Sequence, residues 1–336
     1  MKIVLASHVF HPGVGGIETM STLLASEFVA QGHEVKVVTH ATYDGLDQFP
    51  FEVWRRPSPQ KLLNLLRWCD VYFHNNISLK TIWPLLFVRR PWVVANHTWI
   101  ARSDESLGWQ DRLKRFLLRY ATCISVSQAV ADHVAVPSTI IGNPYRNDLV
   151  RPLEDVPRNK DIVFLGRLVS DKGADLLIDV LQRLKEKGVV AQLTIIGEGI
   201  EYSNLQQQAE ALGVKDQVSL AGHKSGNELV HLLNEHRILV VPSRWKEPFG
   251  IVALEGLACG CVVVGSEGGG LKDAIGNCGV TFPNGDAAAL AEIISDLLSN
   301  PQKLVEYRAQ TQQHLEDHQS PTVAAAYLNV FQGVIR

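Results

Sequence analysis

The amino-acid sequence predicts an α/β protein built from two Rossmann-like, doubly wound domains. Short apolar segments typical of buried strands alternate with helical segments along the whole chain, as parallel sheets with helices on both faces require. A length of 336 residues is enough for two such domains, each with its own hydrophobic core. The polar, proline-containing segment 146–160 indicates a linker, so we expect an N-terminal domain at 1–150 and a C-terminal domain at 151–318.

Composition and charge indicate an ordinary globular protein. Hydrophobic residues make up 46% of the chain and charged residues 20%, which is typical of globular domains. The net charge is −3, and the first 150 residues hold 15 Lys and Arg against 12 Asp and Glu. The N-terminal domain is therefore mildly basic. Since the chain as a whole is not, we expect no nucleic acid among its partners.

Cysteine usage and the first residues predict a cytoplasmic location. The five cysteines are odd in number and scattered, without a Cys-x-x-Cys pair, which disfavours a disulfide framework or a zinc site and favours a reducing compartment. A strand pattern follows Met1 directly, where a signal peptide would have a charged and then an apolar region. No apolar run reaches the ~18 residues that a membrane span needs.

The first domain begins with a strand, a glycine-rich turn, a helix and a second strand. Segments 2–7 and 33–40 have strand character, and residues 18–31 show helical spacing of apolar residues, so together they predict a βαβ unit. In the turn, Gly15 and Gly16 allow backbone N–H groups to come close to a phosphate or a sugar hydroxyl. The alternative is a tight turn that binds nothing.

This turn matches only half of the fingerprint of dinucleotide-binding proteins. After Gly13 and Gly15, the third glycine of the pattern is replaced by Glu18, and the second strand ends in His40 instead of an acidic residue. Both differences disfavour a nicotinamide-dependent oxidoreductase.

Two later strands of the first domain end in polar residues. Segments 70–76 and 91–99 contain His74 and His97 near their C-terminal ends, and ligands of open parallel sheets bind at the carboxyl ends of the strands. We therefore expect His97 to lie in a site, with a structural role as the alternative. For His74 we favour the structural role, with a place in a site as the alternative. Further strands are expected at 51–56 and 121–128.

The segment 109–120 is amphipathic and basic. One helical face carries large apolar residues: Trp109, Leu113, Phe116, Leu117 and Tyr120. Around it lie four basic residues: Arg112, Lys114, Arg115 and Arg119. We favour a core helix with a solvated basic face. The alternative is a surface that binds an anionic acceptor or, with the apolar and basic run 82–90, makes a peripheral contact with the inner face of the membrane.

The second domain opens with two cations at a strand end. Strand 162–165 is followed by Arg167, Lys172 and a helix at 174–187. On this strand-to-helix loop the two cations would neutralise a diphosphate, arginine through its planar fork and lysine as a point charge. The alternative places Arg167 in a structural ion pair and Lys172 on the surface at the helix start.

The rest of the second domain continues the alternation of strands and helices. Strands are expected within 191–201 and 217–225, each followed by a helix, and a second glycine-rich loop lies at 265–276. The final helices are expected at 286–299, 301–317 and 321–333.

Two glutamates flank the start of one short helix in this domain. The buried strand 238–241 leads into a loop with Glu247, and a helix is predicted at 251–258 with Glu255 in its first two turns. Between the carboxylates, the helix start offers unpaired N–H groups and a partial positive charge. This pattern favours a ligand with phosphates in its middle and hydroxyls at both ends. Taken singly, either glutamate has a simpler explanation, as an acid that complements the helix dipole or pairs with a lysine.

The pattern E-P-F-G-I-V-A-L-E from Glu247 to Glu255 resembles the E-x7-E signature of retaining glycosyltransferases of the GT-B fold, in the large family 4 group (glycosyl transferases group 1). G-R-L-V-S-D-K-G around Arg167 resembles that family's G-R-L-x-x-x-K-G motif, and Gly15-Gly16 resembles its GG loop. The resemblance is strong over residues 160–275. It implies two Rossmann-like domains that face a cleft, with a last helix, at 319–336, that returns to the N-terminal domain.

The resemblance also implies the reaction and the site. It implies transfer of a hexose, with retention of configuration, from a UDP- or GDP-sugar to a glycan or glycolipid acceptor. Neither a cofactor nor a metal is implied, and the sequence contains no Asp-x-Asp pair. The implied catalytic residues are His97, Arg167, Lys172 and Glu247. The implied donor-binding residues are Gly15, Gly16, Arg167, Lys172, His223, Lys224, Glu247, Phe249, Gly250, Ile251, Val252 and Glu255.

Three other functions are kept as alternatives. A sugar-nucleotide epimerase of GT-B shape would turn over the donor with no acceptor present. A nicotinamide-dependent oxidoreductase would bind NAD, against the incomplete glycine fingerprint. A sensor of nucleotide-sugars would bind the donor without turnover.

Overall fold

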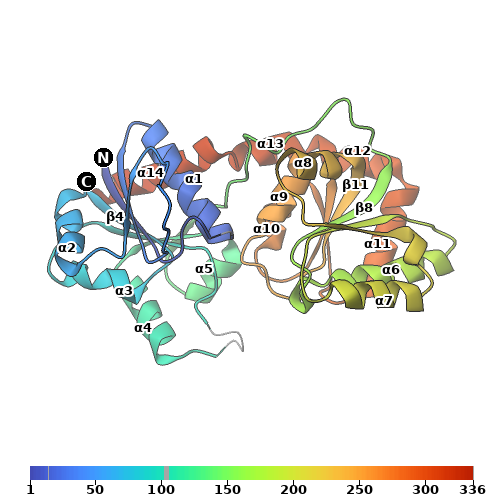
Figure 1. Ribbon diagram of the computed structural model, residues 1–336, viewed down its shortest axis with the longest axis horizontal. Coiled ribbons are helices and arrows are strands. Elements are labelled where there is room, and N and C mark those ends of the chain that lie inside the picture. Colours follow the sequence, from blue (N-terminus) through green and yellow to red (C-terminus); the bar gives the residue numbers. More distant parts are fainter. Residues whose placement is uncertain (14, 102–105, 336) are drawn as a thin grey trace. The chain divides into compact units, whose positions relative to one another are not determined.

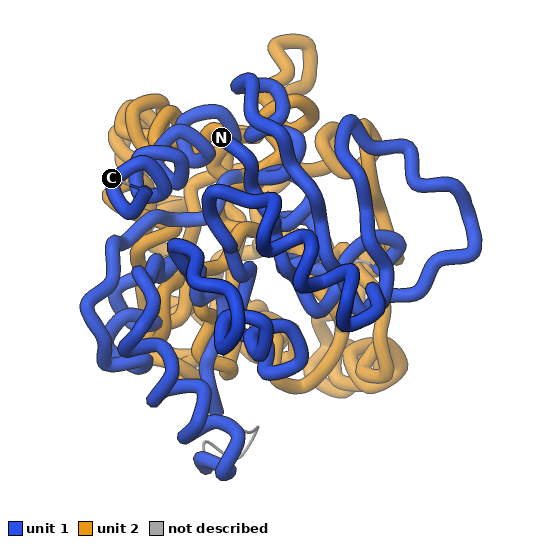
Figure 2. The backbone as a smooth tube through the Cα atoms, turned by 90° about the vertical axis from the view of Figure 1, so that its left-hand side faces the viewer, with its two compact units in different colours: residues 1–144, 320–336 blue, residues 145–319 orange. Residues whose placement is uncertain are grey.

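The computed structural model describes residues 1–13, 15–101 and 106–335, and the chain divides into two compact units. Unit 1 contains residues 1–144 and 320–336, and unit 2 contains residues 145–319. Figure 1 shows the elements of each unit and Figure 2 shows the two units in different colours.

Unit 1 contains a seven-stranded parallel sheet. The strands are β1 (Lys2–Ser7), β2 (Glu34–Thr39), β3 (Glu52–Arg55), β4 (Val71–Asn75), β5 (Trp92–Asn96), β6 (Thr122–Ser125) and β7 (Ser138–Ile140). Their order is β3-β2-β1-β4-β5-β6-β7. The order therefore reverses between β1 and β4, and the carboxyl ends of these two strands mark the switch point where open α/β sheets bind ligands.

Helices cover both faces of this sheet. One face is covered by α1 (Gly16–Ala30) and by the C-terminal helix α14 (Ser320–Ile335), which lie side by side in Figure 1. Phe331 of α14 packs 5.5 Å from the ring of Phe28 and 5.1 Å from that of Phe73. The other face carries α2 (Pro59–Trp68) and α5 (Gln128–Val134), with the short α3 (Leu79–Ile82), the 3-10 helix η1 (Trp83–Leu86) and α4 (Trp109–Leu118) beside them.

Unit 2 contains a six-stranded parallel sheet. The strands are β8 (Lys160–Leu165), β9 (Leu193–Ile196), β10 (Val218–Gly222), β11 (His236–Val241), β12 (Val262–Ser266) and β13 (Gly279–Phe282). Their order is β10-β9-β8-β11-β12-β13, so the switch point lies between β8 and β11.

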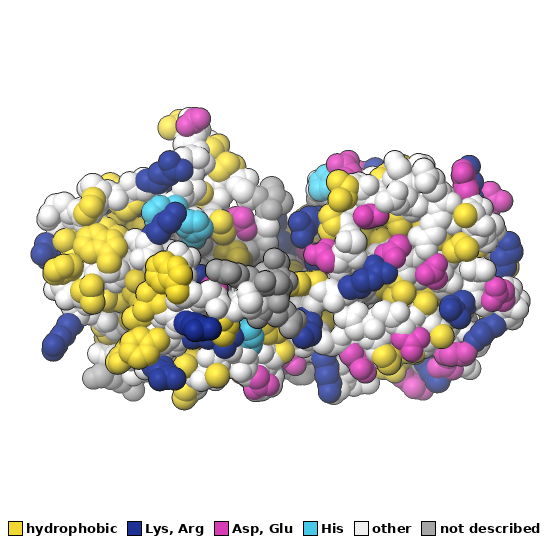
Figure 3. All heavy atoms as spheres, turned by 90° about the horizontal axis from the view of Figure 1, so that it is seen from below, with side chains coloured by type: hydrophobic (Ala, Val, Ile, Leu, Met, Phe, Trp, Pro, Cys, Tyr) yellow, Lys and Arg dark blue, Asp and Glu magenta, His cyan; other side chains and the backbone are white. Residues whose placement is uncertain are grey.

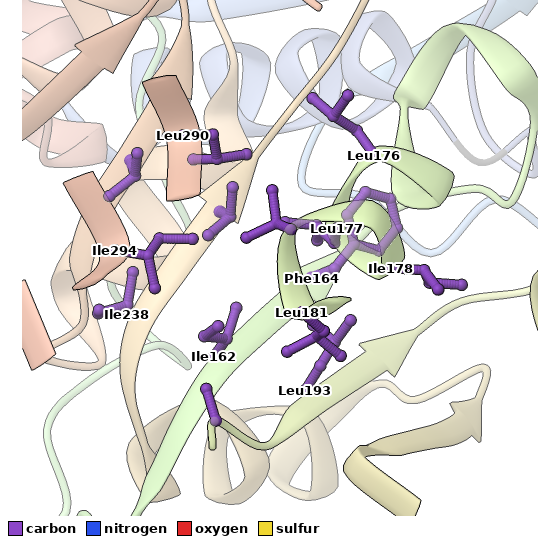
Figure 4. Close-up of a cluster of buried hydrophobic side chains, with 14 of the residues drawn as sticks. Ile162, Phe164, Leu176, Leu177, Ile178, Leu181, Leu193, Ile238, Leu290 and Ile294 are labelled. Atoms are coloured by element: carbon purple, nitrogen blue, oxygen red, sulfur yellow. The ribbon is translucent and has the colours of Figure 1, made fainter. Parts of the chain in front are cut away.

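The helices of unit 2 enclose an apolar core. They are α6 (Ala174–Glu186), α7 (Tyr202–Ala211), α8 (Gly226–Glu235), α9 (Ile251–Ala258), α10 (Leu271–Ile275), α11 (Ala287–Ser299), α12 (Pro301–Ala309) and α13 (Thr311–Asp317), with 3-10 turns η2 (Ser170–Lys172) and η3 (Lys215–Gln217). Figure 4 shows Ile162 and Phe164 of β8 gathered with Leu177 and Leu181 of α6 and with Ile294 of α11 in one buried cluster.

The predicted doubly wound architecture is confirmed in both units, with differences at four places. The edge strands β7 and β13 were not predicted, and the single helix expected at 301–317 is two helices, α12 and α13. The segment 146–160 is not a free linker, because it is bound to unit 2. There, the Asn234 side chain accepts a hydrogen bond from the Leu153 N–H at 2.8 Å, and Arg158 donates to the His236 carbonyl at 2.6 Å. By its contacts, unit 2 begins at residue 145 instead of 151.

The expectation that 109–120 forms a core helix is wrong. Leu118 is buried, but Trp109, Phe116 and Tyr120 are exposed. The periodicity identified an amphipathic helix correctly, but it does not report whether another element covers the apolar face.

Among the described residues, no helix is both long and apolar enough to span a bilayer.

Candidate functional site

Two loops at the switch point of unit 2 bring together a cation and a carboxylate. Lys172 follows β8 and Glu247 follows β11, and the Lys172 Nζ lies 2.5 Å from the Glu247 Oε1. The Ser243 hydroxyl donates to the same carboxylate oxygen at 2.8 Å. Both charged side chains are largely shielded from water, which strengthens their interaction relative to a surface ion pair. The sequence predicted both residues for the site but not their direct contact.

The close approach of these loops depends on glycine. Gly173 has a φ of +70°, and a Cβ at this position would lie 2.1 Å from the Pro242 carbonyl oxygen. The backbone N–H groups of Arg244 and Trp245 then donate to the Asp171 carbonyl at 2.8 and 3.1 Å. The β8 loop and the β11 loop are therefore joined through their backbones.

Arg244 is a site-supporting residue that the sequence analysis missed. Its guanidinium donates to both carboxylate oxygens of Asp175, at 2.7 and 2.6 Å, and to the Ser170 carbonyl at 2.9 Å. A bidentate pair of this kind fixes geometry as well as charge. Because the partners lie 69 positions apart in the sequence, no local pattern indicated the pair.

The glycine-rich loop after β12 supports Glu247 from the other side. The Gly270 N–H donates to the Glu247 carbonyl at 2.7 Å, and Glu247 and Gly269 form an isolated parallel bridge. A Cβ on Gly269, whose φ is +69°, would lie 2.2 Å from the Glu247 carbonyl oxygen. The Ser266 hydroxyl also donates to the Ser243 carbonyl at 2.7 Å. The loop therefore holds the Glu247 backbone in place.

Helix α9 begins beside Glu247, at Gly250. The φ of Gly250 is +102°, which favours glycine, and a Cβ there would lie 2.6 Å from a Leu271 methyl carbon. The first N–H groups of the helix, those of Ile251 and Val252, have no partner within the helix and carry the positive end of its dipole. They form a ready anion site. The Phe249 side chain, predicted to bind the donor, is instead buried 5.5 Å from the His318 ring, so only its backbone remains available to a ligand.

Glu255 is a half-buried carboxyl on α9. Burial raises its pKa to about 7, and the nearby Arg146 opposes this shift. Within the described residues, no group donates a hydrogen bond to the Glu255 carboxylate. A ligand hydroxyl would supply the missing donor.

The other predicted residues of unit 2 lie on loops at the same edge of the sheet. Arg167 is exposed and has no carboxylate partner in the described part of the chain, so the alternative of a structural ion pair is wrong. His223 is exposed and Lys224 pairs with Glu228, both at the carboxyl end of β10. Since the strands are parallel, all these loops open at one edge.

In unit 1 the predicted glycines lie at the start of α1. Gly15 is the N-cap residue, and a Cβ on it would lie 2.5 Å from a carboxylate oxygen of Glu18. Gly16 has open space on its side-chain face. The Glu18 side chain therefore folds back over the Gly15 turn and takes the place that a third glycine would have left open.

His97 lies at the carboxyl end of β5 with one ring nitrogen free. Its Nδ1 is 3.0 Å from the Asn143 Oδ1, and its backbone N–H donates to the Asn76 Oδ1 at 2.8 Å. Because Nδ1 donates to an amide oxygen, Nε2 is the unprotonated acceptor, and among the described residues it is buried without a partner. Burial lowers the pKa of His97 to about 4, so the ring is neutral near pH 7. A sugar hydroxyl is a suitable donor to it.

His74, by contrast, is structural. It is fully buried, accepts a hydrogen bond from the Trp92 indole at 2.9 Å and lies 3.1 Å from the Thr81 hydroxyl. Burial lowers its pKa to about 3. The structural role favoured for His74 is therefore confirmed.

A pocket of about 220 Å³ lies at the switch point of unit 1. Its walls include His8, Asn75, Asn76, Asn96, Thr98, Trp99, Asp111 and Lys114. Within the described residues, the Asn75 Oδ1 and the Asn76 Nδ2 are buried without hydrogen-bond partners. One is an acceptor and the other a donor, as a hydroxyl-rich ligand requires. Sequence analysis noted these polar strand ends but did not assign the asparagines to a site.

Comparisons with known proteins agree with this architecture. The family model described as "Glycosyl transferases group 1" matches residues 147–314, and the model described as "Glycosyltransferase Family 4" matches residues 14–137. The first covers most of unit 2, and the second covers most of unit 1.

Two curated relatives are similar in sequence. The glycogen synthase of Mycobacterium tuberculosis (strain H37Rv) is 36% identical over 174 residues, which cover 51% of this chain and 42% of the relative. The chain thus matches less than half of that enzyme's length. The phosphatidyl-myo-inositol mannosyltransferase of Mycobacterium leprae is 25% identical over 354 residues, covering 95% of this chain and 93% of the relative.

A solved structure shows the same fold over the whole chain. Alr3699/HepE of Anabaena, in complex with UDP, superposes with a TM-score of 0.84 at 21% identity, and the match covers 99% of this chain and 100% of that one. This likeness shows that the chain has the two α/β domains of the GT-B fold. The family model over residues 147–314 shows that the chain belongs to the glycosyl transferases group 1 family.

Proposed function

We propose that the protein is a retaining hexosyltransferase that uses a UDP- or GDP-sugar as donor and a glycan or lipid-linked sugar as acceptor. The observation that carries the proposal is the Lys172–Glu247 pair at the switch point of unit 2, beside the first turn of α9. Its position matches the place where open α/β sheets bind nucleotides. The pair offers one cation for a phosphate and one carboxylate for hydroxyls.

Each part of the donor has a matching group in unit 2. Arg167, Lys172 and the N–H groups at the start of α9 would hold the diphosphate and stabilise the negative charge that builds on it as it departs. Glu255 would accept hydrogen bonds from the ribose hydroxyls, and Glu247 from the hydroxyls of the donor sugar. The loop with His223 and Lys224 would lie beside the base.

In unit 1, two groups are suited to sugar hydroxyls. The free Nε2 of His97 would accept a hydroxyl hydrogen bond, and Gly15 and Gly16 would bring backbone N–H groups to the donor. The pocket with Asn75 and Asn76 would hold the sugar ring of the acceptor, because its volume suits one ring and its unpaired groups suit hydroxyls.

The proposed reaction exchanges one bond at the anomeric carbon for another on the same face. The bond from this carbon to the phosphate oxygen breaks, with its electron pair leaving on the diphosphate. The acceptor oxygen forms the new bond, and its proton passes to the departing phosphate oxygen. The cations of unit 2 would carry the developing charge, so we expect no requirement for a divalent metal.

The names of similar proteins support this choice of substrates. The Mycobacterium leprae relative is named as a mannosyltransferase, and the Anabaena protein has also been solved in complex with UDP-glucose. A hexose donor is thus consistent with both.

A thermal-shift panel tests the proposal directly. UDP, GDP, ADP, the corresponding hexose conjugates and NAD would be added to the wild type and to Glu255→Ala. One nucleotide diphosphate should raise the midpoint, because a ligand at 100 times its dissociation constant stabilises by about 2.7 kcal/mol, and the effect should be lost in the variant. A shift with NAD alone would overturn the proposal.

Turnover separates the remaining alternatives. With donor and acceptor present, alanine at Glu247, Arg167 or Lys172 should lower the transfer rate by about 10²-fold or more, as losing a transition-state contact does. Full activity in these variants would contradict the assigned site. Conversion of the donor sugar with no acceptor present would indicate the epimerase, and binding without any turnover would indicate a sensor.

A further inference from the structure

Unit 1 exposes an apolar and basic surface on α4, which we call the α4 surface. It consists of Trp109, Arg112, Leu113, Phe116, Arg119 and Tyr120. The exposed fractions of its aromatic side chains are 69% for Trp109, 49% for Phe116 and 71% for Tyr120. Figure 3 shows hydrophobic side chains gathered with Lys and Arg on the side of unit 1 from which α4 projects in Figure 1.

The exposed apolar side chains of α4 all lie on one face of the helix. Residues 109, 113, 116 and 120 follow the three- and four-residue spacing that places side chains on one side of a helix. The opposite side is anchored, because Leu118 is buried while Asp111 and Lys114 line the unit 1 pocket. The helix is therefore held by its polar and buried side and presents its apolar side to the surroundings.

A second exposed apolar site lies on the same layer of unit 1. Leu86, at the end of η1, is 83% exposed and Phe87 is 73% exposed. Leu85 of η1 and Leu117 of α4 both pack against the same buried cluster. Single exposed apolar residues are normal, but several large ones on the same face of a domain indicate an interaction surface.

The charges around the aromatic side chains are positive. Arg112 and Arg119 are exposed, and neither has a carboxylate partner in the part of the chain that the structure describes. Over residues 82–101 and 106–120 the one acidic residue is Asp111, which faces Lys114 at 3.7 Å. The partner of this surface should therefore be negatively charged and accept apolar groups.

We propose that the α4 surface docks unit 1 onto an anionic lipid bilayer. Aromatic side chains prefer the level of the lipid head groups, and neighbouring arginines bind anionic head groups. Aromatic residues and arginine are also enriched at protein interfaces, so a protein partner is the other occupant that the experiment below has to distinguish.

Docking has a consequence for the pocket in unit 1. Asp111 and Lys114 of its wall belong to the same helix as the α4 surface. One side of α4 would then contact the bilayer while its other side lines the pocket. Docking would thus bring the pocket close to a sugar carried on a lipid.

Vesicle flotation with the full-length protein tests the proposal. The probes are vesicles of phosphatidylcholine alone and of phosphatidylcholine mixed with phosphatidylglycerol. We expect binding to the anionic vesicles and weaker binding at high salt, because salt screens the arginines. Arg112→Glu with Arg119→Glu should lower the partition coefficient at least tenfold, since each basic residue near an anionic surface contributes about fivefold. Trp109→Ser with Phe116→Ser should lower it by about tenfold or more.

Matched variants in unit 2 are the controls. Ile200→Ser with Val190→Ser removes two other exposed apolar side chains, and Arg183→Glu reverses another exposed arginine. These should leave binding unchanged. An unchanged midpoint of thermal unfolding in the absence of lipid shows that each variant is folded.

Three results would overturn the proposal. They are failure to bind either kind of vesicle, equal loss of binding in the control variants, and a protein oligomer that the α4 variants dissociate while vesicle binding persists. Since donor binding is measured separately, a failure here leaves the proposed transferase activity standing.

Discussion

Gly173 and Pro242 touch through their backbones, with no room for a side chain between them: a Cβ on Gly173 would lie 2.1 Å from the Pro242 carbonyl oxygen. This contact sets the spacing between the loop that carries Lys172 and the loop that carries Glu247. It makes a glycine, which has no catalytic group, a determinant of the site.

Gly173→Ala should therefore lower both stability and nucleotide affinity. The alanine would have to adopt a left-handed backbone conformation, with a φ of +70°, and its Cβ would clash with the Pro242 carbonyl oxygen. Gly188→Ala is the matched control, because Gly188 has a φ of +79° and nothing within 4 Å of its Cβ position. Both variants should lose about 1 kcal/mol from backbone strain, and only Gly173→Ala should lose more. Thermal unfolding and calorimetric titration with UDP measure the two effects; equal behaviour of the variants would contradict the role of the contact.

Replacing the two members of the ion pair should have opposite effects on nucleotide binding. Lys172→Met should weaken UDP by about tenfold to a hundredfold, as loss of a charged hydrogen bond does. Glu247→Gln releases the Lys172 ammonium from its partner, so UDP should bind as well as before or better. UDP-glucose should lose affinity relative to UDP in this variant, because the sugar loses an acceptor. Titration calorimetry measures the affinities of both variants for UDP and UDP-glucose. An equal loss of affinity for both ligands in both variants would contradict the separate roles of the two residues.

Glu255 should make stability depend on pH. Its pKa is raised from 4.5 to about 7 in the folded protein, so between these values the native state binds more protons than the unfolded chain. The free energy of unfolding should then fall as the pH rises through this window, by up to about 3 kcal/mol, and level off above it. Glu255→Gln removes the effect. Unfolding midpoints of the two proteins between about pH 5 and pH 8 should diverge in favour of the variant as the pH rises; curves that stay parallel would contradict the prediction.

His97 should remain neutral through the physiological range. Burial holds its pKa at about 4, below its value of 6.5 in an unfolded chain, so protonation from below pH 6.5 should destabilise the fold. Nitrogen NMR of histidine-labelled protein should show a neutral ring with the proton on Nδ1 at pH 6 and above, and His97→Gln assigns the signal. Protonation of His97 near pH 6.5 would show that its Nε2 is not a buried acceptor.

Much of unit 2 was predictable because its signals are local. The predicted helix at 251–258 coincides with α9, since an apolar run there is bounded by Gly250 and Gly260, both with positive φ. Strand ends also predicted which loops would carry Arg167 and Lys172. Local sequence determines these features because each depends on residues within one turn or one strand.

Features that depend on distant residues were not predictable in the same way. The Lys172–Glu247 contact and the Arg244–Asp175 pair join loops far apart in the sequence, and no periodic pattern encodes such contacts. The raised pKa of Glu255 comes from burial, which requires the whole packed domain. Phe249 was expected to bind the donor because it lies in the motif between Glu247 and Glu255. Its ring instead packs against the ring of His318.

The return of α14 to unit 1 means that unit 2 is, in effect, an insertion within unit 1. During synthesis the ribosome completes residues 145–319 before it releases the helix that covers Phe28 and Phe73. Unit 2 can therefore fold as a contiguous segment before α14 covers its face of the unit 1 sheet. A chain that stopped before residue 320 would leave that aromatic face open to chaperones and to aggregation, although every residue of the proposed donor-binding motif in unit 2 would already be in place.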